Sequence, residues 1–281
     1  MAYLLGIDVG TSGTKALVID EEGRALGSAT IDYPLSTPQP GWAEQDPLDW
    51  WRATGAAVRA ACERAGISPQ AIAGVGLSGQ MHGSVFLDEA NQVLRPAILW
   101  CDQRTAAQCE RITERVGREN VVRITCNPVL TGFTAPKILW LKRHKPLAYA
   151  QLKYIMLPHD YLNFLLTGNY IMECGDASGT ALFNGARRQW SQRICGIIDP
   201  DLAGLLPDII DSSQAAGNVS RNAALHFGIP GGIPVSSGGG DNMMGAIGTG
   251  TVRDGFLTMS LGTSGTLYGY SDSPLADPDK G

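Results

Sequence analysis

The sequence predicts a mixed α/β or α+β domain, and three observations carry this prediction. Short apolar runs separated by tight turns stand at both ends of the chain, which is typical of β-meanders. Between them, helical patterns alternate with short buried strands. A length of 281 residues, with 44% hydrophobic and 17% charged residues, gives a globular chain a sizeable core. This length suits one large domain or two ordinary ones.

Three strands open the predicted domain, because their residues have β character and glycine-containing turns separate them. They are expected at residues 3–9, 14–19 and 24–33. A helix follows: Asp46 is a favourable N-cap, Pro47 suits the first helical position, and Gly66 ends the helix.

The rest of the chain alternates further strands with helices. Strands are expected at 71–78 and 235–237, hairpins at 85–88 with 93–99 and at 256–261 with 266–270, and helices at 103–116, over most of 136–167 and from 242 to 247.

The opening motif returns in weaker form near the end of the chain. Residues 6–14 are Gly-Ile-Asp-Val-Gly-Thr-Ser-Gly-Thr, and residues 260–266 are Ser-Leu-Gly-Thr-Ser-Gly-Thr. Two copies are too few for a solenoid; they fit a duplicated fold whose halves each lend one turn to a shared cleft. We therefore expect residues 1–245 to form a complete first domain and 246–281 to form the first hairpin of an incomplete second one.

Composition narrows the function classes. A net charge of −5, without a segregated basic region, argues against nucleic-acid binding. The six cysteines form no Cys-x-x-Cys pair, which is typical of reduced thiols in a cytoplasmic protein. The first residues lack the basic region of a signal peptide, and the apolar runs are far shorter than the ~20 residues of a membrane helix.

The repeated turn is the first candidate site. Glycines allow consecutive N–H groups to point into one concavity, where threonine and serine hydroxyls add donors for phosphate. Asp8 stands beside the first turn and could hold Mg²⁺ through its waters. A plain hairpin turn is the structural alternative, and the second copy favours phosphate. The predicted phosphate-binding residues are Gly10, Thr11, Ser12, Gly13, Gly262, Thr263, Ser264 and Gly265.

The second candidate site is Asp241, which follows three glycines at the end of an expected strand. In phosphoryl transfer to an alcohol, an aspartate so placed orients the hydroxyl and accepts its proton. Asp241 is therefore the predicted catalytic residue, with Asn242 beside it as a substrate contact. A role only as the N-cap of the next helix is the structural alternative.

A polar segment between two glycines follows the strand at 71–78 and forms the third candidate site. Gln80 and His82 offer directional hydrogen bonds that select a polyol, and Met81 adds an apolar wall. A lone histidine is more often structural, but flanking glycines favour binding here. The other three histidines lack this context and are expected to be structural: His144, His159 and His226.

The fourth candidate site places Trp100 and Asp102 beside a charged helix start, which suits stacking on a sugar ring or chain. Three further tryptophans are expected in the core: Trp42, Trp50 and Trp51.

Together these stretches resemble the FGGY carbohydrate kinases, which share the ribonuclease H-like ATPase fold of actin, Hsp70 and hexokinase. The two Gly-Thr-Ser-Gly turns are similar to the phosphate motifs of the family, and residues 132–141, Gly-Phe-Thr-Ala-Pro-Lys-Ile-Leu-Trp-Leu, to its first signature stretch. Residues 238–242 resemble the segment with the catalytic base. The likeness covers essentially the whole chain.

Within the family, three stretches look most like the xylulose-specific members: Gln-Met-His-Gly at 80–83 and the residues at 42–47 and 95–100. The resemblance implies ATP-dependent phosphorylation of D-xylulose to D-xylulose 5-phosphate. It implies that Asp241 is the base, Asp8 holds Mg²⁺, the two turns bind phosphates, and the substrate residues named above shape the sugar pocket.

Two departures from the family pattern keep alternatives open. Cys101 stands where xylulose-specific members usually have asparagine, and family members are much longer, with an adenosine pocket in their second domain. A kinase for ribulose, gluconate or glycerol is therefore an alternative, as is a sugar-binding fragment without kinase activity. An actin-like or Hsp70-like ATPase that regulates partners is disfavoured by the sugar-site residues. A homodimer, formed through an exposed apolar face, is a further expectation.

Overall fold

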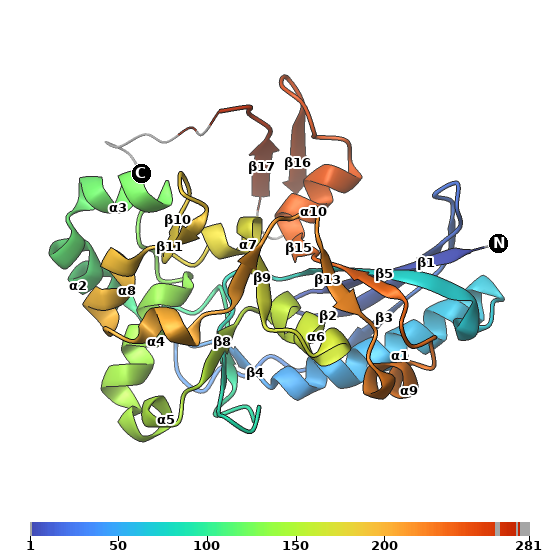
Figure 1. Ribbon diagram of the computed structural model, residues 1–281, viewed down its shortest axis with the longest axis horizontal. Helices are drawn as coiled ribbons and strands as arrows, with labels where there is room; N and C mark the ends of the chain where they lie inside the picture. Colours follow the sequence, from blue (N-terminus) through green and yellow to red (C-terminus); the bar gives the residue numbers. More distant parts are fainter. Residues whose placement is uncertain (1, 262–264, 274, 276–281) are drawn as a thin grey trace.

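A computed structural model describes residues 2–261, 265–273 and 275. Its centre is a seven-stranded sheet with the order β13-β14-β5-β1-β2-β3, in which β15 also pairs with β5 (Figure 1). The strands are β1 (Tyr3–Val9), β2 (Gly13–Ile19), β3 (Ala25–Asp32), β5 (Ile72–Gly79), β13 (Ala215–Asn218), β14 (Pro234–Ser236) and β15 (Gly239–Gly240). β5 runs parallel to β1, β14 and β15, and the other pairs are antiparallel.

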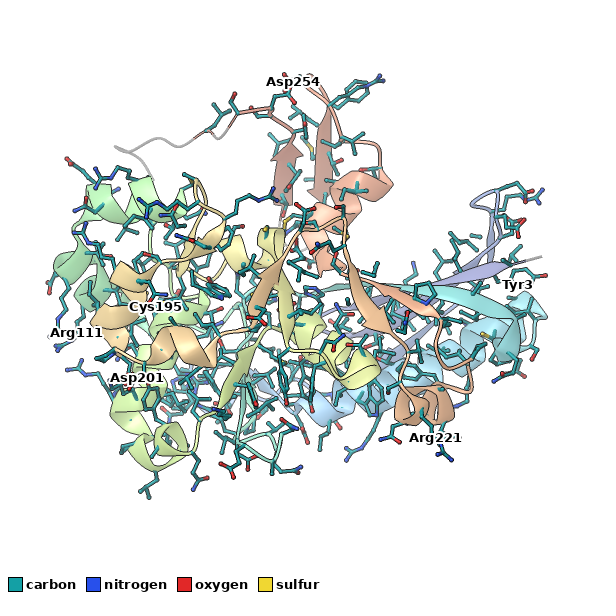
Figure 2. All side chains as sticks on the ribbon, in the orientation of Figure 1. Tyr3, Arg111, Cys195, Asp201, Arg221 and Asp254 are labelled. Atoms are coloured by element: carbon teal, nitrogen blue, oxygen red, sulfur yellow. The ribbon has the colours of Figure 1, made fainter. Side chains whose placement is uncertain are left out.

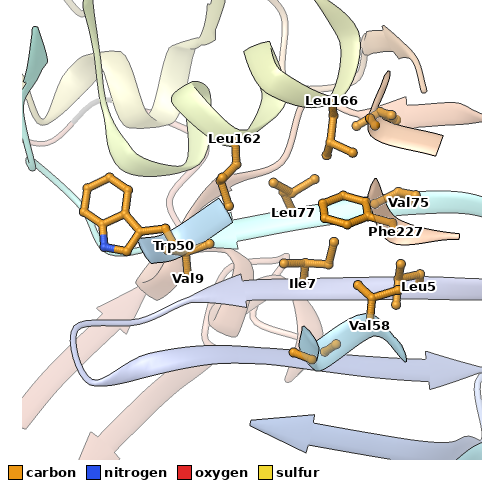
Figure 3. Close-up of a cluster of buried hydrophobic side chains, with 14 of the residues drawn as sticks. Leu5, Ile7, Val9, Trp50, Val58, Val75, Leu77, Leu162, Leu166 and Phe227 are labelled. Atoms are coloured by element: carbon orange, nitrogen blue, oxygen red, sulfur yellow. The ribbon is translucent and has the colours of Figure 1, made fainter. Parts of the chain in front are cut away.

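One face of this sheet holds the larger hydrophobic core. Because side chains alternate along a strand, Leu5, Ile7 and Val9 of β1 are buried on this face, while Leu4 is 44% exposed on the other. Three helices supply the opposite side of the core: α1 (Pro47–Ala65), α6 (Pro158–Thr167) and α9 (Arg221–Phe227). Figure 3 shows their side chains meeting those of β1 and β5.

The caps of α1 explain why this helix begins and ends where the sequence predicts. The Asp46 side chain accepts a hydrogen bond from the Leu48 N–H, and Pro47 occupies the first turn. At the other end, Gly66 has a φ of 67°, a left-handed conformation that glycine adopts without strain.

A second lobe, mainly helical, has its own hydrophobic core. It contains α2 (Ala106–Val116), α3 (Arg118–Thr125), α4 (Thr134–His144), α5 (Pro146–Ala150) and α8 (Gln192–Ile198). Figure 2 places Arg111, Cys195 and Asp201 in this lobe, apart from Tyr3 and Arg221 in the sheet lobe. The mixture of sheet and helices confirms the predicted α/β character.

Short strand pairs and helices complete the described chain. The pairs are β4 (Glu44–Gln45) with β7 (Ala97–Ile98), β6 (Val85–Leu87) with β8 (Tyr154–Met156), β9 (Ile171–Glu173) with β12 (Asp208–Ile210), β10 (Phe183–Asn184) with β11 (Gln189–Trp190), and β16 (Leu257–Leu261) with β17 (Gly265–Gly269). The helices are α7 (Cys174–Ser178), α10 (Asp241–Gly248), η1 (Pro69–Ala71) and η2 (Leu202–Leu205). None of the helices in these described ranges has the length and apolar character needed to cross a bilayer.

Two element predictions hold only in part, and long-range contacts account for the differences. The expected hairpin of 85–88 with 93–99 forms only in part: an antiparallel bridge joins Leu87 to Val93, and the Leu94 N–H donates to the Phe86 carbonyl at 2.9 Å, but the longer pairing of β6 is with β8 and that of β7 is with β4. The helical stretch expected over 136–167 is interrupted by β8, whose apolar residues pair with β6. The expected domain boundary after residue 245 falls inside α10 and stays a prediction.

Candidate active site

The sheet brings three of the predicted motifs to one edge. Asp8 on β1 lies opposite Ser78 on β5, and Gly239 and Gly240 of β15 lie opposite Ser78 and Gly79. Because these strands are parallel, their carboxyl ends meet at the same edge (Figure 1). The first Gly-Thr-Ser-Gly turn, the polar segment after β5 and Asp241 therefore emerge side by side.

Contacts from three directions brace the first turn. The Gly10 N–H donates to the Gly13 carbonyl at 3.0 Å, and the Tyr33 hydroxyl donates to the Gly10 carbonyl at 2.5 Å. Gln45 Nε2 donates to the Thr11 carbonyl at 2.7 Å. Gly13 is required sterically, since a Cβ there would lie 2.7 Å from the Ile31 carbonyl oxygen. The turn is a rigid part of the sheet edge.

Thr11 connects this turn to two predicted sugar-site residues. Trp100, which is 42% exposed, donates from Nε1 to Thr11 Oγ1 at 2.9 Å. The same hydroxyl donates to Gln80 Oε1 at 3.4 Å, and Gln80 Nε2 donates to the Gly10 carbonyl and to Gln45 Oε1. The buried Gln80 amide is thus bonded to protein at both ends, so it supports the turn as well as standing in the predicted sugar segment.

Asp8 and Asp241 form an acidic pair at the mouth of this edge. Asp8 Oδ1 accepts a hydrogen bond from Ser78 Oγ at 2.6 Å. Asp241 is the first residue of α10, whose N-cap is Gly240, and its Oδ1 accepts from the Asn242 N–H at 2.8 Å. Although the Asp241 side chain is exposed, partial loss of hydration, together with the carboxylates of Asp8 and Asp176, raises its pKa. Carboxylate oxygens are ligands that suit Mg²⁺, so the residue types at this edge fit a divalent cation.

A hollow of about 260 Å³ lies beside Asp241, between α10 and the hairpin of β16 and β17. Hydroxyl-bearing residues contribute to its lining: Thr249, Thr258, Ser260, Thr266 and Tyr268. Gly265 begins β17 next to this hollow. The other predicted residues of the second turn, Gly262, Thr263 and Ser264, lie outside the described residues.

Met81 joins the predicted sugar segment, residues 80–83, to the predicted catalytic segment, residues 238–242. A Cβ at Gly240 would lie 2.7 Å from Met81 Cγ, so glycine is needed for this close approach. Asn242 Nδ2 lies 3.7 Å from Met81 Sδ. The predicted substrate contacts on the two segments are therefore direct neighbours.

His82 is a neutral imidazole near pH 7. Burial lowers its pKa to about 4; the Lys137 charge acts in the same direction, and the Asp176 carboxylate opposes them. A neutral ring offers one donor and one acceptor, which matches the two-way hydrogen bonding of a sugar hydroxyl.

Asp102 can shape the sugar pocket only indirectly. Its side chain is fully buried, and its oxygens accept from the Ala43 N–H at 2.7 Å and from the Arg104 guanidinium at 2.6 to 3.0 Å. Arg104 also donates to Glu44. This network fixes the chain that follows Trp100. Cys101 is half-buried, and burial raises the pKa of its thiol.

His159 is structural, as its sequence context predicts, but it lies directly beneath the catalytic segment. Its Nδ1 is 2.6 Å from Asp176 Oδ2, and its Nε2 is 3.3 Å from Asp160 Oδ1 and 3.2 Å from the Ser237 carbonyl. Burial alone would lower the pKa of His159, but the two carboxylates raise it to about 10. These three side chains could also share an ion, since their ligand atoms lie within 4.8 Å. The protonated imidazole supplies one positive charge to this buried cluster, and burial raises the pKa of Asp160, which lowers the negative charge of the cluster.

The comparisons with known proteins identify the family and the fold. Residues 3–248 match the N-terminal domain of the FGGY family of carbohydrate kinases, and the chain belongs to this family. The expected fold is confirmed for the first domain by solved kinase structures. The ligand-bound xylulose kinase of Lactobacillus acidophilus is 26% identical with a TM-score of 0.92, over 99% of this chain and 56% of that one.

Kinases named for two different sugars, xylulose and gluconate, are similar to this chain. Xylulose kinase of Haemophilus influenzae is 42% identical, over 96% of this chain and 57% of its own length. The gluconate kinase of Lactobacillus acidophilus is 26% identical with a TM-score of 0.88, over 95% of this chain and 53% of that one. The chain thus spans about half the length of the relatives that it matches.

Sequence reasoning missed two buried residues that support the site. Gln45 holds the first turn, and Lys137 donates from Nζ to the His82 carbonyl at 2.7 Å. Both lie in stretches that carry the family likeness, which was the available signal. Neither residue type shows a function by its spacing alone.

Proposed function

We propose that this chain provides the sugar-binding and catalytic half of a kinase that transfers phosphate from ATP to D-xylulose, giving D-xylulose 5-phosphate. The observation that carries the proposal is the sheet edge where Asp8, the His82 segment and Asp241 meet. The 42% identity to a xylulose kinase supports the choice of sugar.

Asp241 is the proposed general base. It would accept the proton of the terminal sugar hydroxyl as that oxygen forms its bond to the γ-phosphorus and ADP departs. Its raised pKa makes its carboxylate a stronger base than an ordinary aspartate. The hydroxyl can approach because Asp241 is exposed at the start of α10.

The phosphates would lie over the Gly10–Gly13 turn, where Thr11 and Ser12 offer hydroxyls and the backbone is held in place. Asp8 would hold Mg²⁺, with Asp241 nearby; when bound, the ion offsets the charge of the phosphates. Asp8 is positioned for this by its hydrogen bond from Ser78.

The sugar would lie among His82, Met81, Trp100 and Asn242. The neutral His82 ring would exchange hydrogen bonds with hydroxyls, and Trp100 and Met81 provide apolar faces. Asp102 and Gln80 would support this pocket through their contacts with Arg104 and Thr11.

A cytoplasmic location and a homodimer remain part of the proposal. The hairpin of β16 and β17 has exposed apolar side chains that association would cover, including Leu257, Met259, Leu261 and Leu267.

Calorimetric titration of this chain with D-xylulose, D-gluconate and glycerol tests the proposed substrate. We expect saturable heat with D-xylulose, and weaker or no binding of the other two. Preference for gluconate or glycerol would assign a different sugar, and binding without any ATP-dependent phosphorylation would favour a sugar-binding fragment. No binding of any of the three would contradict the proposed pocket.

A further inference from the structure

We propose that residues 132–137, at the start of α4, hold the sugar-binding segment in its binding geometry, and that the buried Lys137 ammonium is the positioning group. This inference rests on the proposed function, because it assigns a purpose to the support of the predicted sugar site. Residues 132–137 belong to the signature-like stretch that the proposed mechanism does not otherwise use.

His82 is held by three side chains of this stretch. Lys137 Nζ donates to the His82 carbonyl at 2.7 Å, and Thr134 Oγ1 donates to the same oxygen at 3.4 Å. The imidazole packs against the Phe133 ring, with centroids 4.7 Å apart. The carbonyl and the imidazole of His82 are therefore both held by residues 133–137.

The backbone of His82 needs such support. Its φ is 62°, in the left-handed region that non-glycine residues occupy at a cost. A conformation of this kind persists when surrounding contacts determine it. Without the Lys137 and Thr134 donors, fewer contacts would stabilise the left-handed conformation of His82 within residues 80–83.

The same stretch also abuts the second sugar segment. A Cβ at Gly132 would lie 2.6 Å from the Trp100 carbonyl oxygen, so the two backbones are in close contact. The Ala135 N–H donates to the Thr180 carbonyl at 2.9 Å, which anchors the start of α4. Next to Thr180, Gly179 faces the His82 ring: a Cβ there would lie 2.5 Å from His82 Cε1.

Burial of the charged Lys137 ammonium carries a desolvation cost. Its side chain is fully buried, and burial lowers its pKa to about 7, against the opposing influence of nearby acidic groups. The charged and titratable groups around it are Asp102, Arg104, Cys101, Cys109 and His82. Asp102 is already bonded to Arg104, and burial keeps both thiols protonated near pH 7.

An apolar side chain of similar length would fill this space without the desolvation cost of a buried charge. A buried lysine here therefore trades stability for the charge-assisted hydrogen bond to His82. Stability alone does not explain a buried lysine at position 137. Support of the sugar segment explains it.

The variant Lys137→Met tests the inference, with Lys142→Met as its matched control. Lys142 lies on the same helix, is partly exposed and bonds Asp199, away from the sugar segment. The first measurement is hydrogen exchange of the amides at 80–84. We expect exchange there to rise by roughly tenfold or more in Lys137→Met, because a charge-assisted hydrogen bond is lost. We expect no such rise in Lys142→Met, and an unchanged or higher melting temperature for Lys137→Met.

Unchanged exchange at 80–84 in Lys137→Met would overturn the inference, whatever the sugar results. Faster exchange throughout the chain with a lower melting temperature would also overturn it, because the role would then be general stability. If Lys137→Met does not fold, the native chain still decides: corrected for intrinsic rates, protection at 80–84 should fall between pH 6 and pH 9, as the amine loses its proton. Constant protection over that range would contradict the inference.

The titration with D-xylulose separates this inference from the proposed function. We expect Lys137→Met to bind at least about tenfold more weakly than the native chain. If the native chain binds no D-xylulose, the proposed substrate fails, and the exchange result still decides whether Lys137 holds the segment. If both proteins bind equally well, the function stands and the positioning role fails.

Discussion

Lys137 and His159 are both fully buried cationic residues, one beneath the sugar segment and one beneath the catalytic segment, yet their pKa values move in opposite directions. Lys137 bonds a carbonyl, and Asp102, a carboxylate that favours its charged form, is bonded to Arg104. His159 lies between Asp160 and Asp176. Equal burial thus gives opposite charge preferences, and the available carboxylates decide which one results.

This difference gives the two residues opposite effects on stability as pH rises. The folded pKa of Lys137 is about 7 against a usual 10.5, so between these values the unfolded chain binds more protons and stability increases with pH. The folded pKa of His159 is about 10 against a usual 6.5, so its stabilisation is complete below pH 6.5 and is lost as pH rises through 10. The two trends oppose each other over the same interval.

The largest expected effect comes from removing the histidine of this pair. His159→Gln leaves two buried carboxylates without their cation, which should lower the free energy of unfolding at pH 7 by about 3–5 kcal/mol. Denaturant unfolding measures this loss. The control is His226→Gln, a half-buried ring that stacks on Trp51, for which we expect a loss of no more than ~1.5 kcal/mol. Equal losses in both variants would show that the carboxylates around His159 do not matter.

Asp241→Asn sharpens the distinction between the two segments. Because Asp241 is the proposed base, turnover of D-xylulose by a kinase that also carries the ATP-binding half should fall by roughly 10²–10⁴-fold. The affinity of the variant for D-xylulose should change little, since the substitution does not alter the sugar segment or Lys137. Kinetics and calorimetry on the same preparation separate the two quantities, and a parallel loss of binding and turnover would make Asp241 a structural residue.

Lys137→Met should have a smaller effect on stability, of the opposite sign to His159→Gln. At pH 6 the variant should be more stable than the native chain by about 1–4 kcal/mol, because it carries no buried charge. Above pH 7 this gap should narrow, since the native lysine is then neutral when folded. Unfolding in denaturant at pH 6, 8 and 10 follows the gap. A gap that stays constant across this range would refute the assigned pKa.

The smallest effect is expected from Trp100→Phe, which removes the hydrogen bond to Thr11 and keeps an aromatic face. D-xylulose should bind about 2–10-fold more weakly, in line with ~0.5–1.5 kcal/mol for one hydrogen bond. Trp190→Phe is the control, because its indole bonds the Pro207 carbonyl outside the site. If both variants bind alike, Trp100 does not contact or support the sugar.

The parts of the fold that could be predicted are those specified locally. Asp46 and Gly66 delimit α1 through their own side-chain and backbone preferences, and the glycines of the first turn specify a tight connection. The pairing of β6 with β8 could not be predicted, because it joins Leu87 to Tyr154, far away in the sequence.

The candidate site shows the same division. The sequence places Asp8 near the end of a strand and His82 and Asp241 after strands, and the sheet then brings those strand ends together. It does not show that Asp102 is enclosed by Arg104, or that Lys137 lies beneath His82, because both facts depend on tertiary packing. The sequence shows which side chains can carry a charge. Their burial and their bonding partners in the folded chain decide whether they bind substrate or support other residues.

A crystal structure of this chain with D-xylulose tests the central claim most directly. The account predicts a sugar hydroxyl within roughly 2.6–3.2 Å of the Asp241 carboxylate, with the His82 ring bonded to another hydroxyl. Sugar bound elsewhere, or bound here with Asp241 out of reach of every hydroxyl, would contradict the assignment of this sheet edge as the phosphoryl-transfer site.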